Sequence, residues 1–83
     1  MACKIEYKSS VSKDLKKLDK KITKRILNEL EKNLRENPDI GVPLSGQFKG
    51  LFKYRVGDYR IIYTKTIKEV LILRIGHRSK IYK

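Results

Sequence analysis

The stretch FKYRVGDYRIIY, residues 52–63, constrains the fold of this chain more than any other segment. Apolar and cationic side chains alternate on both sides of Gly57 and Asp58. Glycine at the first central position suits a two-residue type II′ turn between antiparallel strands. The segment therefore predicts a β-hairpin, and the turn determines which residues of the two strands lie opposite each other.

The predicted pairing divides the hairpin into two chemically different faces. We expect one to be a core face, because it carries the side chains Phe52, Tyr54, Val56, Tyr59, Ile61 and Tyr63. The other carries Lys53, Arg55 and Arg60, with Arg55 directly opposite Arg60. A slip of one residue would bury all three cations, so the register is well determined.

The opposed arginines predict an anion-binding surface. Like charges directly across a sheet are destabilising by a few tenths to about 1 kcal/mol. A phosphate placed between them replaces this repulsion with charge-assisted hydrogen bonds. A solvated basic face that binds nothing is the alternative interpretation.

The other segments predict an α+β domain. Residues 3–7 alternate as a first strand, and residues 11–36 have the apolar spacing of an amphipathic helix that ends before Pro38. We expect this helix to break near residues 19–21, because so small a domain cannot support a rod of about 39 Å. The predicted order is β-α-α-β-β-β. It describes an antiparallel sheet with the helical hairpin packed on one face, in a single domain spanning residues 1–83.

The last strand, EVLILRI, is apolar on both faces, as a central strand would be. A three-residue turn before it would put alternate apolar residues on the core face, namely Leu71, Leu73 and Ile75. The same turn would place Arg74 beside Arg60, whereas a two-residue turn would reverse the two faces. We expect the three-residue turn because it avoids burying Arg74.

The charge of the chain indicates the kind of partner. The formal net charge is +12, and residues 44–83 hold ten of the 21 Lys and Arg residues but only two acids. Such an excess favours a polyanion or an acidic protein as partner, with plain solubility as the alternative.

The compartment follows from what the sequence lacks. One cysteine cannot build a disulfide framework. No apolar run approaches the roughly 20 residues of a membrane span, and the first ten residues have no apolar signal-peptide region. We therefore expect a cytoplasmic protein with no membrane partner.

The residue types exclude several chemistries. Two carboxylates in the second half cannot build a two-metal nuclease site, Cys3 and His77 alone are not a zinc site, and no phosphate-binding glycine loop is present. We expect no metal and no cofactor. Lys, Arg, His and Tyr can still cleave RNA, because the 2′-OH is a built-in nucleophile. A Lys or Tyr whose pKa is lowered by nearby cations would serve as the base.

Two segments, PLSGQFKGLFKYRVGDYRIIY and VLILRIGHRSKIY, resemble the RelE/ParE superfamily of toxins, and the RelE-like branch in particular. The resemblance covers nearly the whole chain, and its specific part is residues 43–82. It implies the toxin of a type II toxin-antitoxin system, a metal-independent endoribonuclease. Such a toxin cleaves mRNA in the ribosomal A site by 2′-OH attack and inhibits translation. It also implies a cognate RelB-like antitoxin with an acidic or amphipathic segment.

The resemblance implies roles for individual residues. Lys53 and Arg60 match the cations that bind and stabilise the scissile phosphate. Arg78, or alternatively His77, matches the cation that contributes to phosphate binding or leaving-group protonation. Tyr82 matches the tyrosine that positions the substrate base and aids proton transfer. Further RNA-phosphate contacts are expected from Arg55, Arg74 and Lys80.

One departure from the family pattern leaves alternatives open. Well-studied members carry a second lysine two positions before the one matched by Lys53, where this chain has Leu51. Lys49 could take its place if the chain bends, but the identity of the general base stays open. The alternatives are a catalytically weakened RNA- or antitoxin-binding member and a ParE-like toxin that poisons DNA gyrase without nuclease activity. A general RNA-binding module is a weaker one.

Overall fold

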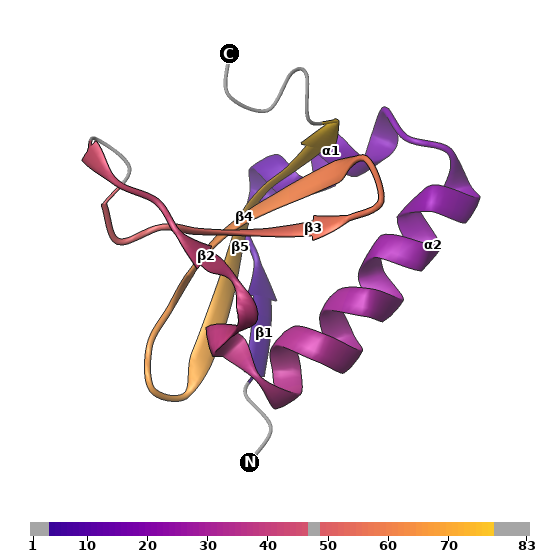
Figure 1. The fold of residues 1–83 in the computed structure, drawn as a ribbon. Helices are drawn as coiled ribbons and strands as arrows, with labels where there is room; N and C mark the ends of the chain where they lie inside the picture. The colour runs from indigo at the N-terminus through magenta and orange to yellow at the C-terminus, as the bar shows by residue number, and fades with distance from the viewer. Residues whose placement is uncertain (1–3, 47–48, 78–83) are drawn as a thin grey trace.

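The computed structural model describes residues 4–46 and 49–77. In chain order the elements are β1 (Lys4–Tyr7), α1 (Ser9–Lys16), α2 (Lys20–Glu29), the π-helical turn η1 (Leu30–Leu34), the 3₁₀ turn η2 (Pro38–Ile40), β2 (Val42–Pro43), β3 (Phe52–Val56), β4 (Tyr59–Lys65) and β5 (Glu69–His77). They form the sheet β1-β5-β4-β3-β2 with two helices (Figure 1). The predicted α+β class is confirmed. No helix of the described residues has the length and apolar character of a membrane span.

The sheet is mixed, so the expectation of a wholly antiparallel sheet is wrong at one edge. β1 runs parallel to β5, with Ile5 opposite Val70 and Tyr7 opposite Ile72. The other strand pairs are antiparallel. β1 and β5 are not consecutive strands, since the helices and the strands β2, β3 and β4 lie between them in the chain, and a connection of this length permits parallel pairing. A second difference is the short strand β2, which is an addition to the predicted order β-α-α-β-β-β.

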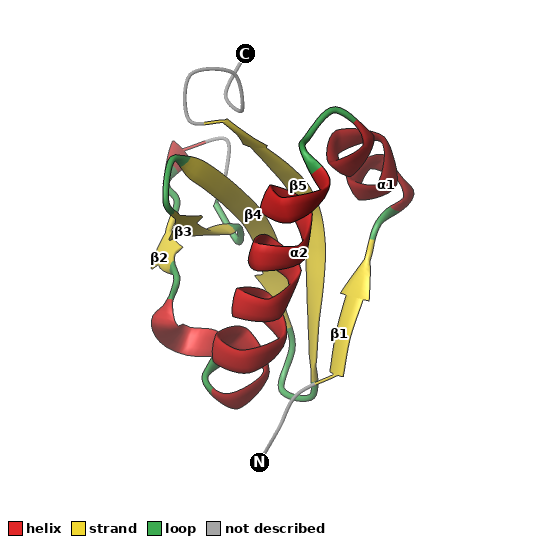
Figure 2. Ribbon diagram, turned by 90° about the vertical axis from the view of Figure 1, so that its right-hand side faces the viewer, coloured by secondary structure: helices red, strands yellow, loops and turns green. Residues whose placement is uncertain are grey.

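The helical hairpin breaks where the sequence predicted. The side chain of Asp19 caps α2 by accepting a hydrogen bond from the backbone N–H of Lys21 at 2.8 Å. Figure 2 shows α2 lying across one face of the sheet. Ile26, Leu30 and Leu34 recur every four residues along α2 and η1, and all three are fully buried. On the sheet side they meet a core that includes Val56, Ile61, Tyr63, Val70, Ile72 and Ile75.

The register of the central hairpin is confirmed. Phe52 faces Tyr63, Tyr54 faces Ile61, and Val56 faces Tyr59. Gly57 has a φ of 60°, and no non-glycine residue in the described part of the chain has a positive φ. Asp58 therefore follows with a negative φ, which agrees with the predicted type II′ turn.

The register between β4 and β5 differs from the prediction. Tyr63 faces Ile72 and Lys65 faces Val70, so Val70 and Ile72 are core residues at 0% exposure. Leu71 is exposed instead. The predicted three-residue turn is wrong, because the backbone N–H of Thr66 bonds the carbonyl of Glu69 at 2.9 Å and closes a tighter turn. The two faces of this part of β5 are therefore reversed relative to the expectation.

A β-bulge then restores the alternation that the turn reversed. The register shifts by one residue beside Ile62 and Tyr63, and Leu73 is the extra residue on β5. Leu73 is half-buried rather than a full core residue. Past the bulge, Arg74 faces Ile62 and Gly76 faces Arg60, so the expectation that Arg74 lies beside Arg60 is wrong. Arg74 nevertheless avoids the core face.

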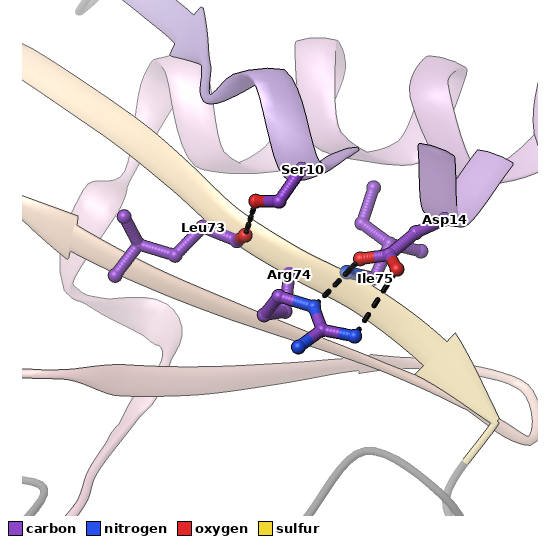
Figure 3. Close-up of polar contacts among 5 residues, drawn as sticks. All are labelled: Ser10, Asp14, Leu73, Arg74 and Ile75. Atoms are coloured by element: carbon purple, nitrogen blue, oxygen red, sulfur yellow. Dashed lines mark hydrogen bonds and ion pairs between the residues drawn. The ribbon is translucent and has the colours of Figure 1, made fainter. Parts of the chain in front are cut away.

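Helix α1 completes the edge of β5 where β1 stops (Figures 1 and 2). The backbone N–H of Lys8 bonds the carbonyl of Ile72 at 2.9 Å. The hydroxyl of Ser10 then bonds the carbonyl of Leu73 at 2.8 Å, and the backbone N–H of Ile75 bonds a carboxylate oxygen of Asp14 at 3.1 Å (Figure 3). Side chains of α1 thus satisfy backbone groups that would otherwise be an open sheet edge.

Candidate nucleic-acid interface

Two rows of residues cross the sheet on the face away from α2, and we call them the open face. The first row joins Val42 of β2, Lys53 of β3, Ile62 of β4 and Arg74 of β5. The second joins Arg55, Arg60 and Gly76. The sequence prediction that Lys53, Arg55 and Arg60 share one face, opposite the core, is confirmed.

The open face is basic, and three of its four cations have no acidic partner among the described residues. The residues of its two rows include four cations and no carboxylate. Within the described part of the chain, Lys53, Arg55 and Arg60 form no ion pair, whereas Arg74 does. Lys53 and Arg60 are half-buried and Arg55 is exposed. This arrangement attracts an anion and gives it several donors at once.

Ile62 gives the open face an apolar centre. It is only 7% exposed, although it lies on the side away from the helices. Its two cross-strand partners are Lys53 and Arg74, whose long aliphatic stems can lie over it while their charged ends stay in solvent. Ile62 therefore separates the two cations of the first row by one apolar residue.

Arg74 is tied to the neighbouring helix. Its Nε and Nη2 atoms donate to the two carboxylate oxygens of Asp14, at 2.9 Å and 3.2 Å (Figure 3). The hydrogen bond to Asp14 and the charge of Asp14 raise the pKa of Arg74. The structure therefore places Arg74 at the border between β5 and α1, in the row of the open face next to that of Arg60.

His77 is placed away from Lys53 and Arg60. It is the cross-strand partner of Tyr59, and the two rings meet edge-on with centroids 5.7 Å apart. Tyr59 belongs to the core side of the hairpin, so His77 shares that side rather than the open face. The structure does not bring His77 together with the cations that were predicted to act with it.

Lys49 lies in a bent segment just before β3. The backbone N–H of Leu44 bonds the carbonyl of Leu51 at 2.9 Å, and Gly50 has a φ of 93°. The carbonyl of Gly50 accepts a hydrogen bond from the hydroxyl of Thr64 at 3.1 Å. The chain therefore bends just after Lys49, and Lys49 itself is exposed.

Three predicted residues, Arg78, Lys80 and Tyr82, lie outside the described residues. Their roles stay predictions. In the ranges 4–46 and 49–77, no group of three or more His, Cys, Asp or Glu residues could hold a metal ion.

Asp14 was not predicted from the sequence as a residue of this site. Its side chain is 9% exposed and holds Arg74, which lies 60 residues further along the chain. A signal was present, because Asp14 occupies the apolar stripe that includes Val11, Leu15 and Leu18. An acid in a buried stripe requires a hydrogen-bonding partner from elsewhere in the fold.

Solved structures of toxins share this fold. The toxin-antitoxin complex RelBE2 from Mycobacterium tuberculosis contains a chain with 28% identity and a TM-score of 0.89, and the match covers 96% of this chain and 95% of that one. YafQ from Escherichia coli is 26% identical with a TM-score of 0.68, and the match covers 98% and 99%. E. coli RelE is 18% identical with a TM-score of 0.76, and the match covers 96% of this chain and 88% of RelE. At this identity the match supports the fold alone.

The fold and its basic open face therefore define a small toxin domain of the RelE/ParE superfamily. Residues 5–82 match the family of ParE toxins of type II toxin-antitoxin systems, parDE, and the chain belongs to this family. No curated protein matches the sequence. The recognition made from residues 43–82 is thus confirmed at the level of the superfamily.

Proposed function

We propose that this toxin is a RelE-like endoribonuclease that cleaves mRNA in the ribosomal A site and so inhibits translation. The observation that carries the proposal is the open face, where Arg55 lies directly opposite Arg60 and Lys53 stands in the next pair on the same face, opposite Ile62. No carboxylate stands in the two rows of this face. The natural ligand for such a surface is a phosphate group.

The proposed reaction needs little beyond positive charge and proton transfer. The 2′-oxygen of the RNA forms a bond to phosphorus, and the bond from phosphorus to the 5′-oxygen breaks. The proton of the 2′-OH passes to a base, and the departing 5′-oxygen receives a proton. Lys53 and Arg60 stabilise the additional negative charge on phosphorus during the reaction. The products are a 2′,3′-cyclic phosphate and a 5′-OH.

The remaining roles go to the segment that follows β5. Arg78 would assist phosphate binding or leaving-group protonation, and Tyr82 would position the nucleobase of the RNA substrate and aid proton transfer. The position of His77 beside Tyr59 favours Arg78 over His77 for this role. Lys80 in this segment and Arg55 on β3 would add phosphate contacts. The general base stays open between Lys49, Lys53 and a tyrosine, because Leu51 occupies the position of the family's second lysine.

The ribosome would supply the orientation that this site lacks. The residues of the open face provide charge but few groups that transfer protons at neutral pH. Holding the 2′-OH in line with the departing oxygen is worth several kcal/mol. We therefore expect only slow cleavage of free RNA.

The proposed regulator is a cognate antitoxin in the cytoplasm. Two solved relatives are toxin-antitoxin complexes, RelBE2 and DinJ-YafQ. A RelB-like partner with an acidic or amphipathic segment suits a toxin with a net charge of +12.

A second candidate function is poisoning of DNA gyrase. The match of residues 5–82 to the ParE toxins favours this function. Poisoning of gyrase is the activity that the resemblance to ParE-like toxins implies. A gyrase poison does not need the cleavage set formed by Lys53, Arg60, Arg78 and Tyr82. The basic open face is the reason that RNA cleavage is proposed first.

Two assays with the purified chain separate the candidates. In one, the toxin is added to ribosomes carrying a defined message, and in the other to gyrase and relaxed plasmid. Cleaved message with 2′,3′-cyclic phosphate ends supports the ribonuclease. Intact message together with inhibited supercoiling overturns it in favour of the gyrase poison, and no effect in either assay rejects both activities.

A further inference from the structure

We infer that Arg74, oriented by Asp14, forms a second phosphate subsite at the β5 border of the open face. This subsite would bind the RNA phosphate next to the one held by Lys53 and Arg60. The inference rests on the proposed function, because it assigns a further contact for the same RNA. It also gives a role to Asp14, the buried acid on α1.

The position of Arg74 suits a neighbouring phosphate. Arg74 faces Ile62, and Lys53 faces Ile62 from the other side, so the two cations lie about 10 Å apart across three strands. Arg60 faces Gly76, which makes Arg74 its diagonal neighbour at about 7–8 Å. This spacing is comparable to the distance between successive phosphates of an extended RNA strand.

The guanidinium of Arg74 keeps a complete phosphate-binding edge. It has five N–H groups, and Asp14 takes one on Nε and one on Nη2. The two N–H groups of Nη1 and the second of Nη2 remain, and one N–H of Nη1 together with that of Nη2 forms an edge that can bind a phosphate bidentately. The Arg74 side chain is 53% exposed, so solvent and ligand can reach this edge.

Asp14 can hold this orientation because it is itself held. Its side chain is 9% exposed, and it accepts a third hydrogen bond from the backbone N–H of Ile75 at 3.1 Å. The hydroxyl of Ser10 on the same helix bonds the carbonyl of Leu73 at 2.8 Å, which fastens α1 to the strand (Figure 3). A long flexible side chain is thereby ordered before RNA arrives, which lowers the entropy cost of binding.

The bulge at Leu73 supports the inference that Arg74 belongs to the phosphate-binding face. Without it, strict alternation from Ile72 would direct Arg74 to the core face. The extra residue returns Arg74 to the open face, in the row of Lys53. An ion pair that only fastened α1 to β5 would not require the guanidinium to keep its free edge beside the other cations.

The test is equilibrium binding of a single-stranded RNA with 2′-methoxy groups, which the toxin cannot cleave, across a range of salt concentrations. Arg74→Ala should weaken binding about tenfold and reduce the slope of log K against log salt by about 0.7. Arg74→Lys, which can still pair with Asp14, should keep the slope but bind more weakly than wild type. Asp14→Asn should keep the slope and weaken binding several-fold at high salt, where long-range charge is screened.

Lys24→Ala is the matched control, because it removes one exposed cation from α2 on the other side of the sheet and should leave the slope unchanged. The inference is overturned if Arg74→Ala melts at a lower temperature yet binds with the wild-type slope, or if Lys24→Ala lowers the slope equally. It also fails if Asp14→Asn binds like wild type at high salt. If Arg60→Ala also leaves the slope unchanged, the open face does not bind RNA and the proposed function fails with it.

Discussion

Arg55 and Arg60 lie directly opposite each other on β3 and β4, on the face of the sheet that α2 leaves open. The apolar residues on the other side of the same hairpin impose this arrangement, because Val56 must face Tyr59 and Tyr54 must face Ile61. Stability alone would favour an acid at one of the two positions. The pair is therefore a place where stability and anion binding make opposite demands.

Replacing one arginine with an acid should separate these demands. Arg55→Glu puts a carboxylate opposite Arg60. Because opposite charges paired across two strands are stabilising, the change should raise the free energy of unfolding by a few tenths to about 1 kcal/mol. The same change should weaken RNA binding, with Arg55→Gln between the two in both properties. Denaturant unfolding and RNA titration of the three proteins test this. A more stable variant that binds RNA as well as wild type would show that the pair has no role in binding.

The corrected register of β5 makes a matched pair of substitutions informative. Ile72 is fully buried against the helices, whereas its neighbour Leu71 is 36% exposed on the other face. Ile72→Ala should destabilise the fold by about 2–5 kcal/mol, and Leu71→Ala by less than about 1 kcal/mol. Urea unfolding measures both. The opposite order would restore the register expected from a three-residue turn.

Tyr63 fastens the segment between η2 and β2 to the core. Its hydroxyl donates to the carbonyl of Pro38 at 2.8 Å and accepts from the backbone N–H of Gly41 at 3.0 Å. Tyr63→Phe leaves both backbone groups without this partner and should destabilise the fold by about 1–3 kcal/mol. Tyr59→Phe is the control, because no hydrogen bond of the Tyr59 hydroxyl is found among the described residues. Equal thermal shifts for the two variants would argue against the fastening role.

The phenol of Tyr7 should make stability depend on pH in the alkaline range. Burial, and then the charge of Glu31 and its hydrogen bond with the phenol at 3.2 Å, raise the pKa of Tyr7 to about 12. An unfolded tyrosine has a pKa near 10, so the native state favours the protonated phenol. This contribution is complete below pH 10 and is lost as the pH rises from about 10 to 12. The difference in unfolding free energy between wild type and Tyr7→Phe should fall over that range, and a constant difference would contradict the raised pKa.

Local patterns in the sequence predicted the parts of the fold that local forces determine. The alternation around Gly57 and Asp58 fixed the central hairpin, because a period of two has only one apolar register there. The helix break near Asp19 was predicted from the size of the domain, and the structure adds its local cause, a cap formed by the Asp19 side chain and the backbone N–H of Lys21. The parallel pairing of β1 with β5 was not, because it depends on the path of the chain over the sheet.

The candidate site was predictable to a similar extent. The hairpin register brought Lys53, Arg55 and Arg60 to one face without any tertiary information. The position of Arg74 was mispredicted, because a bulge at Leu73 leaves no mark in an alternating pattern. His77 lies two residues after the buried Ile75 and shares its side of the sheet, as alternation along β5 implies. The roles of all these residues in RNA cleavage stay predictions.

The most direct test of the account measures A-site cleavage by Arg60→Ala. Primer extension on ribosome-bound message compares wild type, Arg60→Ala and, as a control on the helix side, Lys24→Ala. Removing one group that stabilises developing charge costs about 100-fold or more in rate. We predict such a loss for Arg60→Ala, with a melting temperature no lower than that of wild type, and the wild-type rate for Lys24→Ala. Cleavage by Arg60→Ala at the wild-type rate, or an intact message with wild-type toxin, would contradict it.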